Sequence, residues 1–174
     1  MLQTGIYTID GQLVDQREHL LNIKPFTRQR VDKILTPADA GDVYHVKLAL
    51  FHGDKFVSDN FYTVSLNRNR FRELRAIGQA GMHTEAERTG AGTLVVHLEN
   101  TGDVPALWNV LQLRDALTGE RVIPAFYDDN YISLLPGEQK SISISIPEAE
   151  IWSTKRLSVS LEGLNVDPVD IPVR

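Results

Sequence analysis

The sequence contains no cysteine among its 174 residues, which excludes disulfide bonds, thiolate metal sites and cysteine nucleophiles. It also lacks an excess of basic residues. The formal net charge is −5, and no basic block marks a nucleic-acid-binding surface. No apolar run reaches the roughly 18 residues that a membrane span needs, and the N-terminus lacks the pattern of a signal peptide. We therefore expect a globular chain whose partners are neither nucleic acid nor membrane.

Metal-ligating and nucleophilic patterns are equally sparse. The five histidines stand singly and never in the HxH or HExxH spacing of a zinc site. The serines of residues 140–146 lie in no GxSxG motif and have no histidine nearby in the sequence. The sequence thus predicts no metal and no cofactor. We interpret these serines as the polar face of a strand.

The sequence is rich in alternating apolar and polar residues. Residues 140–146, KSISISI, place three isoleucines on one face and three serines on the other, as a half-buried strand requires. Short runs rich in Val, Leu and aromatic residues predict further strands at 44–51, 93–98, 109–114 and 157–161. Glycine-containing turns separate these runs at intervals typical of antiparallel sheets. We therefore predict an all-β fold.

One segment has a different period. Phe71, Leu74 and Ile77 recur every third residue, which predicts a turn or two of α or 3₁₀ helix between two β-rich halves. We expect two tandem immunoglobulin-like antiparallel β-sandwiches. The first spans residues 1–67, a short and partly helical linker spans 68–80, and the terminal sandwich spans 81–174. The arginines of the linker are interpreted as solvated.

Three ordered motifs then resemble a known family. Residues 106–113 (ALWNVLQL), 118–124 (TGERVIP) and 127–138 (YDDNYISLLPGE) resemble the terminal β-sandwich of glycoside hydrolase family 2, in the branch of β-mannosidases and exo-β-glucosaminidases. In the first half, residues 7–11 (YTIDG) and 57–62 (VSDNFY) resemble motifs of the preceding sandwich. The resemblance covers nearly the whole chain.

The resemblance implies the last two accessory sandwiches of a multidomain exo-glycosidase, which brace or border its catalytic barrel. In that family the acid and nucleophile glutamates lie on a (β/α)₈ barrel, which needs about 250 residues. This chain has no room for a barrel, so no catalytic residue is carried over and the chain is not expected to be an enzyme by itself. The expected partner is the catalytic barrel domain of a parent glycosidase. An extracytoplasmic location, periplasmic or secreted from bacteria, is implied by the resemblance alone.

Two departures from the family pattern concern the first sandwich. Thr63 stands where a tryptophan is usual, and the chain opens four residues ahead of Gly5, where the family has another strand. We therefore expect the first sandwich to lack its first strand. An open sheet edge invites pairing with another chain, so we predict a homodimer or a covered edge at this domain.

The densest group of polar and aromatic side chains is Tyr127, Asp128, Asp129, Asn130 and Tyr131. A retaining glycosidase needs two carboxyl groups about 5 Å apart, whereas adjacent residues on a strand or turn point in different directions. We therefore interpret these side chains as turn residues that accept backbone N–H bonds. Calcium binding through the carboxylates and the amide, and contact with a sugar or a partner domain, are the alternatives.

Sugar-binding modules present flat aromatic faces. Trp152 is expected in a loop after Pro147 and is the best candidate for an exposed ring, followed by Tyr127 and Tyr131. Trp108 lies in an apolar run, which favours core packing or an interdomain contact. The sequence leaves two functions open: an accessory region of an exo-glycosidase, and a stand-alone carbohydrate-binding module that binds oligosaccharide.

Overall fold

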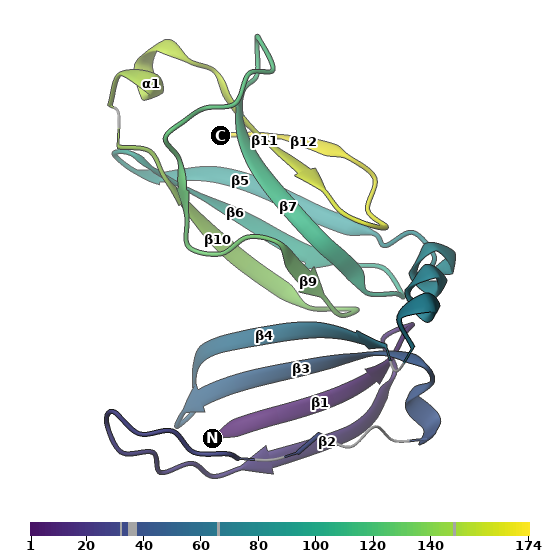
Figure 1. Cartoon of the computed structure of the whole chain (residues 1–174). Coiled ribbons are helices and arrows are strands. Elements are labelled where there is room, and N and C mark those ends of the chain that lie inside the picture. Colours follow the sequence, from purple (N-terminus) through teal and green to yellow (C-terminus); the bar gives the residue numbers. More distant parts are fainter. Residues whose placement is uncertain (32, 35–37, 66, 148) are drawn as a thin grey trace. The chain divides into compact units, whose positions relative to one another are not determined.

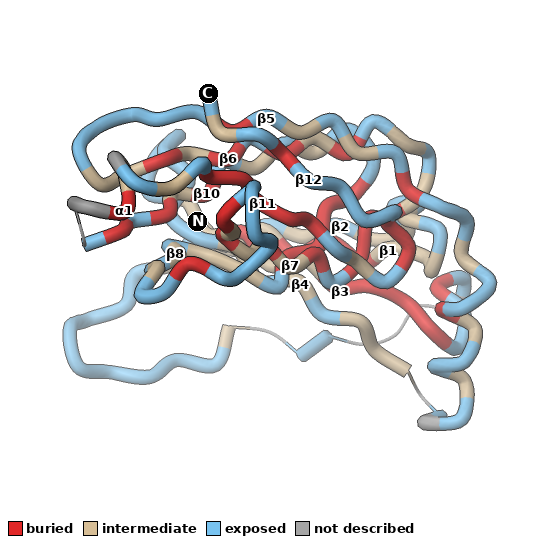
Figure 2. Tube along the Cα trace, turned by 90° about the horizontal axis from the view of Figure 1, so that it is seen from above, coloured by how far each residue is buried: buried red, intermediate tan, exposed pale blue. Residues whose placement is uncertain are grey.

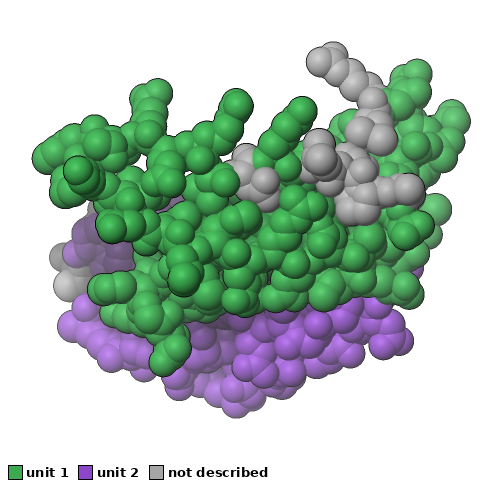
Figure 3. Space-filling view, turned by 90° about the horizontal axis from the view of Figure 1, so that it is seen from below, with its two compact units in different colours: residues 1–77 green, residues 78–174 purple. Residues whose placement is uncertain are grey.

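A computed structural model describes residues 1–31, 33–34, 38–65, 67–147 and 149–174 (Figure 1). The chain divides into two compact units, Met1–Ile77 (unit 1) and Gly78–Arg174 (unit 2), which Figure 3 shows in different colours. Antiparallel strands form the sheets of both units. No helix among the described residues is long and apolar enough to cross a membrane.

The described residues of unit 1 form four strands and two 3₁₀ helices. In chain order they are β1 (Leu2–Thr8), β2 (Leu13–His19), η1 (Ala38–Ala40), β3 (Val43–His52), β4 (Lys55–Ser65) and η2 (Arg68–Ala76). Unit 2 contains β5 (Met82–Gly90), β6 (Thr93–Asn100), β7 (Ala106–Asp115), β8 (Phe126–Tyr127), β9 (Ile132–Leu134), β10 (Gln139–Ser145), α1 (Ala149–Thr154), β11 (Leu157–Glu162) and β12 (Val169–Pro172).

Unit 1 is a single layer in the part of the chain that the structure describes. Its four strands form one antiparallel sheet in the order β2-β1-β3-β4. Ile6, Tyr44 and Val46 form a small buried cluster on this sheet, together with Ala40 from η1. Residues 20–31 form no strand, and Leu20, Ile23 and Phe26 among them are exposed. Where the sequence predicts a first sandwich, the described residues of unit 1 therefore form one sheet.

Unit 2 is a complete β-sandwich. Its two sheets have the strand orders β5-β6-β10-β8 and β12-β11-β7-β9, and their inner faces share one hydrophobic core. The fully buried side chains at the centre of this core are Leu94, Val96, Leu111, Leu113, Ile142, Ile144, Val159 and Leu161. Figure 2 shows buried positions alternating with exposed or half-buried ones along β6 and β10. The all-β, immunoglobulin-like fold class is confirmed.

Two predicted elements agree closely with the structure. The KSISISI run forms β10 and continues to Ile146, with Ile142, Ile144 and Ile146 buried in the core. The segment with three-residue spacing forms η2, a 3₁₀ helix that begins after Asn67, whose side chain accepts a hydrogen bond from the backbone N–H of Asn69. The side chain of Asn67 thus satisfies an N–H group that has no partner within the helix.

Candidate functional site

The carboxylate of Asp128 extends the pairing of two strands. The residue follows β8, and its backbone N–H donates to the carbonyl of Ser143 on β10 at 3.1 Å. Its Oδ1 accepts the backbone N–H of Ser143 at 2.9 Å. The side chain therefore replaces a backbone carbonyl in the ladder beyond the end of β8, where the chain turns away from the sheet.

Asn130 makes a similar link to the opposite sheet. Its Oδ1 accepts the backbone N–H of Leu111 at 2.9 Å, and its Nδ2 donates to the carbonyl of Leu111 at 3.0 Å. This pair of bonds copies the pairing of two strand residues. Asn130 thus fixes the chain to β7 just before β9 begins, and neither an aspartate nor an alanine offers the same donor and acceptor.

The carboxylate of Asp129 has partners different from those of Asp128 and Asn130. Its Oδ1 accepts the backbone N–H of Asn130 at 2.8 Å, and its Oδ2 lies 2.6 Å from Nζ of Lys140 on β10. The two neighbouring carboxylates therefore have different partners. The interpretation of this segment as a turn whose side chains accept backbone N–H bonds is confirmed. Within the described ranges, no three His, Asp or Glu side chains gather in a way that could hold a metal ion.

The two tyrosines that flank the turn differ in exposure. Tyr127 is half-buried against the core, and its hydroxyl oxygen accepts the backbone N–H of Leu113 at 2.8 Å. Burial raises the pKa of this phenol above its usual value, with the Leu113 hydrogen bond opposing the shift. Tyr131 has 74% of its surface exposed and a left-handed backbone with φ of 58°. Only Tyr131 presents most of its ring to solvent.

Trp152 does not lie in a loop, as the sequence suggested, but in the short helix α1. The prediction was wrong because six residues are too few to show a helical period. The indole is half-buried against the core, and the guanidinium carbon of Arg88 lies 4.9 Å from its ring centroid. Its Nε1 is buried and has no hydrogen-bond partner. Contact of Trp152 with a sugar stays a prediction.

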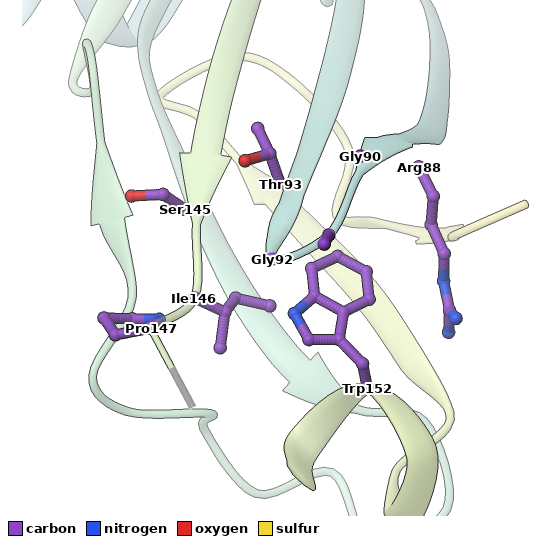
Figure 4. A pocket seen from close by; sticks show the side chains of 9 residues that line it. Arg88, Gly90, Gly92, Thr93, Ser145, Ile146, Pro147 and Trp152 are labelled. Carbon is purple, nitrogen blue, oxygen red and sulfur yellow. The ribbon is translucent and has the colours of Figure 1, made fainter. Parts of the chain in front are cut away.

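A groove of about 630 Å³ lies beside this indole (Figure 4). The turn at Gly90 and Gly92 forms one wall, and Ser145, Ile146 and Pro147 at the end of β10 form another. A Cβ atom at Gly92 would lie 2.9 Å from the carbonyl oxygen of Ile146. Arg88 and Trp152 both line this groove, and the Arg88 guanidinium lies over one face of the indole.

Trp108 is exposed to 45% of its surface, so the alternative of core packing is wrong. The pairing of β7 with β9 shifts register between Ala106 and Asn109, and Trp108 has a left-handed backbone with φ of 54°. This β-bulge turns the indole outward while Leu107 and Asn109 on either side are fully buried. An apolar run alone does not reveal a bulge, because its cause is the pairing with a strand distant in sequence.

Sequence reasoning also missed a set of buried asparagines. Asn165 accepts the backbone N–H of Leu107 at 3.0 Å and donates to the carbonyls of Gly78 and Pro105, each at 2.9 Å. Asn100 donates to the carbonyls of Val104 and Leu134, each at 2.9 Å. These amides satisfy backbone groups in loops that enter the core, so they have a structural role. Isolated asparagines in loops carry no sequence signal for such distant partners.

Comparison with known proteins identifies the class. The family model of the exo-β-D-glucosaminidase Ig-fold domain matches residues 60–166, more than half of the chain. The chain belongs to this family. It is 30% identical to the exo-β-D-glucosaminidase of Streptomyces avermitilis over 125 residues. This alignment covers 66% of this chain and 13% of that protein.

Solved structures show the same fold. The exo-chitosanase of Amycolatopsis orientalis superimposes with a TM-score of 0.75 at 22% identity, over 98% of this chain and 23% of that one. The β-D-mannosidase of Dictyoglomus thermophilum gives a TM-score of 0.63 at 19% identity, over 95% of this chain and 18% of that one. The resemblance stated from the motifs is therefore confirmed. The chain spans only 10–13% of the length of the curated exo-β-D-glucosaminidases that it matches, so the catalytic barrel is absent from it.

Proposed function

We propose that this chain is a non-catalytic accessory region of a larger exo-glycosidase, of the type that removes glucosamine from oligosaccharides. Its immunoglobulin-like units would brace or border a catalytic barrel that lies outside the chain. The observation that carries this proposal is the family match over residues 60–166 on a fold with no barrel among its described residues. The different partners of Asp128 and Asp129 support it, because these two carboxylates then do not act as the pair that glycoside hydrolysis needs.

An assay of the purified chain with p-nitrophenyl β-D-glucosaminide and p-nitrophenyl β-D-mannoside tests the absence of catalysis. We expect no release of p-nitrophenol above the rate of the buffer. The matched control is the double variant Asp128→Asn, Asp129→Asn, which removes both carboxylates. Turnover that survives repurification and falls in this variant would contradict the proposal.

The bracing role requires the catalytic barrel of a parent glycosidase as the partner. We expect the purified chain to bind a separately produced barrel domain of an exo-β-D-glucosaminidase and to raise its melting temperature, because a ligand of the folded state stabilises it by mass action. The isolated unit 2 provides a second test of which unit makes the contact. An unchanged melting temperature at saturating chain concentration would count against bracing.

We further propose that an edge of the unit 1 sheet pairs with a second chain. Strands β2 and β4 stand at the two edges of this sheet, and β4 carries Phe56 and Val57, each about half exposed. Exposed apolar edge strands promote pairing between chains. Light scattering should show a dimer that the variant Phe56→Lys converts to a monomer. A wild-type monomer at high concentration would rule the pairing out.

A further inference from the structure

Two aromatic residues of unit 2 share an unusual backbone. Trp108 and Tyr131 are two of three non-glycine residues with positive φ among the described residues, at 54° and 58°. Bulky side chains rarely adopt this conformation, and where they do, the strain is a guide to function. Both rings are exposed, by 45% and 74%. The fold thus holds two aromatic rings outward at a conformational cost.

The two residues lie close together, Trp108 on β7 and Tyr131 directly before the neighbouring strand β9. The backbone N–H of Trp108 on β7 donates to Oγ of Ser133 on β9 at 3.0 Å. Tyr131 precedes Ser133 by two residues, which is about 7 Å along an extended chain. Asn109, the neighbour of Trp108, pairs with Ile132, the neighbour of Tyr131. The two residues therefore lie near each other at the junction of β7 and β9, and both are exposed there.

Each strained backbone is held by a side chain that the fold has already fixed. Ser133, which accepts from Trp108, is buried within β9. The N–H of Tyr131 donates to Oδ1 of Asn130 at 2.9 Å, and the same oxygen accepts from Leu111 on β7. These contacts fix the backbone positions of both rings before any ligand arrives. Preorganised rings bind with less loss of conformational entropy.

The charge of unit 2 indicates the sign of the ligand. Residues 78–174 contain 14 Asp and Glu against 7 Lys and Arg, a formal net charge of −7, whereas residues 1–77 contain 9 against 11, a net charge of +2. Near Trp108, the exposed Glu162 on β11 pairs with Val110, two residues beyond Trp108 on β7. A cationic ligand is attracted to such a surface, and an anionic one is repelled.

We propose that Trp108 and Tyr131 form a platform that binds a β-linked glucosamine oligosaccharide. The C–H faces of successive pyranose rings would stack on the two aromatic rings, and the protonated amino groups would lie near Glu162 and in the negative field of unit 2. This inference rests on the proposed accessory function and specifies it further: the accessory region holds the cationic polymer that the parent enzyme degrades.

Calorimetric titration of the whole chain with glucosamine oligomers tests the platform, with N-acetylglucosamine oligomers as the neutral probe. We expect the glucosamine oligomer to bind and the neutral oligomer to bind at least several-fold more weakly. Trp108→Ala and Tyr131→Ala should each weaken binding about tenfold, as the loss of one stacked ring implies. Glu162→Gln should weaken binding of the charged oligomer only, and added salt should reduce the difference between the two oligomers.

Controls separate binding from folding. Tyr62→Ala removes an aromatic ring of β4 that is 50% exposed but belongs to unit 1, so it should leave the affinity unchanged. Trp108→Phe and Tyr131→Phe keep a stacking surface and should retain most of the affinity. Melting curves of every variant show whether unit 2 stays folded. If both alanine variants are folded and bind like the wild type, the platform is wrong.

The remaining outcomes distinguish the platform from the proposed accessory function. No binding of glucosamine oligomers by the wild type, with no turnover, overturns the platform and leaves the accessory role in place. Weaker binding of the two alanine variants to a catalytic barrel domain, without sugar binding, also overturns it, since the two residues would then belong to a protein interface. Equal binding of charged and neutral oligomers overturns the assignment to amino sugars. Turnover by the chain contradicts the accessory role alone.

Discussion

The two units of this chain differ in how many apolar side chains they bury. Among the described residues, unit 2 encloses a core of twenty buried apolar side chains between two sheets, whereas the buried cluster of unit 1 has three on one sheet and one from η1. A sheet has two faces, and a single layer leaves at least part of one without a partner layer. Strand content alone therefore does not give a unit a stable fold of its own. Unit 2 should carry the stability of the chain.

Separating the units gives the largest expected effect. We expect residues 78–174 alone to fold cooperatively, because both layers and the shared core are present. Residues 1–77 alone should not reach a cooperative fold as a monomer, because the sheet lacks an opposing layer. Far-UV circular dichroism with thermal melting and the dispersion of amide NMR signals measure this. A cooperative melt of the isolated 1–77 monomer would contradict this expectation, because it would show that unit 1 folds without an opposing layer.

Matched valine truncations sharpen the comparison. Val96 of unit 2 is fully buried and Val46 of unit 1 is 3% exposed. Val96→Ala should cost unit 2 about 2–3 kcal/mol, since its sandwich cannot collapse around the cavity, whereas Val46→Ala should cost unit 1 about 1 kcal/mol. Both tryptophans, Trp108 and Trp152, lie in unit 2, so indole fluorescence follows that unit and circular dichroism follows both. Equal losses in the free energy of unfolding would show that the two cores are equally well packed.

The turn between β8 and β9 allows a comparison within unit 2. Asn130→Ala removes both hydrogen bonds to Leu111 and should cost about 2 kcal/mol, because a partly buried backbone donor and acceptor lose their partner. Asp129→Asn removes an ion pair with Lys140 in which the carboxylate is 44% exposed, and it should cost less than about 0.5 kcal/mol. Denaturant titration followed by indole fluorescence measures both. A reversed order would contradict the structural role of Asn130.

The smallest expected effect is a pH dependence confined to unit 1. His45 is fully buried, with Nδ1 3.1 Å from Oγ1 of Thr63 and Nε2 3.0 Å from the carbonyl of Ile9. A carbonyl can only accept, so Nε2 carries a proton. Burial lowers the pKa of His45 below its ordinary value, against the opposing effects of the Ile9 carbonyl and Asp10, which favours the neutral ring.

As the pH falls, His45 therefore binds a proton at a higher pH in the unfolded chain than in the folded chain. Stability from His45 is present above pH 6.5 and is lost as the pH falls from there towards the lowered folded pKa. Circular dichroism should show unit 1 weakening over this range while the fluorescence of unit 2 stays constant. The variant His45→Gln should flatten the dependence. Loss of stability with rising pH would contradict the assigned neutral ring.

The sequence predicted the elements whose signal is local. The period of two in KSISISI identifies β10, and the spacing of Phe71, Leu74 and Ile77 identifies η2, because each pattern depends only on the geometry of its own segment. The motifs around residues 106–138 also identified the family. The turn chemistry of Asp128 and Asn130 was predictable in kind, although the strands they join were not.

What the sequence did not predict depends on distant partners. Trp108 turns outward because the register of β7 shifts against β9, and Asn165 is buried because its amide bonds the backbone of two distant segments, at Gly78 and at Pro105 and Leu107. The number of layers in unit 1 is likewise a matter of which surfaces meet, and no residue period reports it. The local patterns specify strands, while pairing between strands decides which side chains reach the surface.

The bonds of Asn165 also have a mechanical consequence. Its amide joins Gly78, the first residue of unit 2, to Pro105 and Leu107, and its carbonyl accepts the N–H of Ala80 at 2.8 Å. Two of these four bonds hold the entering chain at Gly78 and Ala80, and the other two hold the start of β7 in the opposite sheet. We therefore expect a pull on the chain ahead of Gly78 to break the bonds to Gly78 and Ala80 before β5 leaves its sheet.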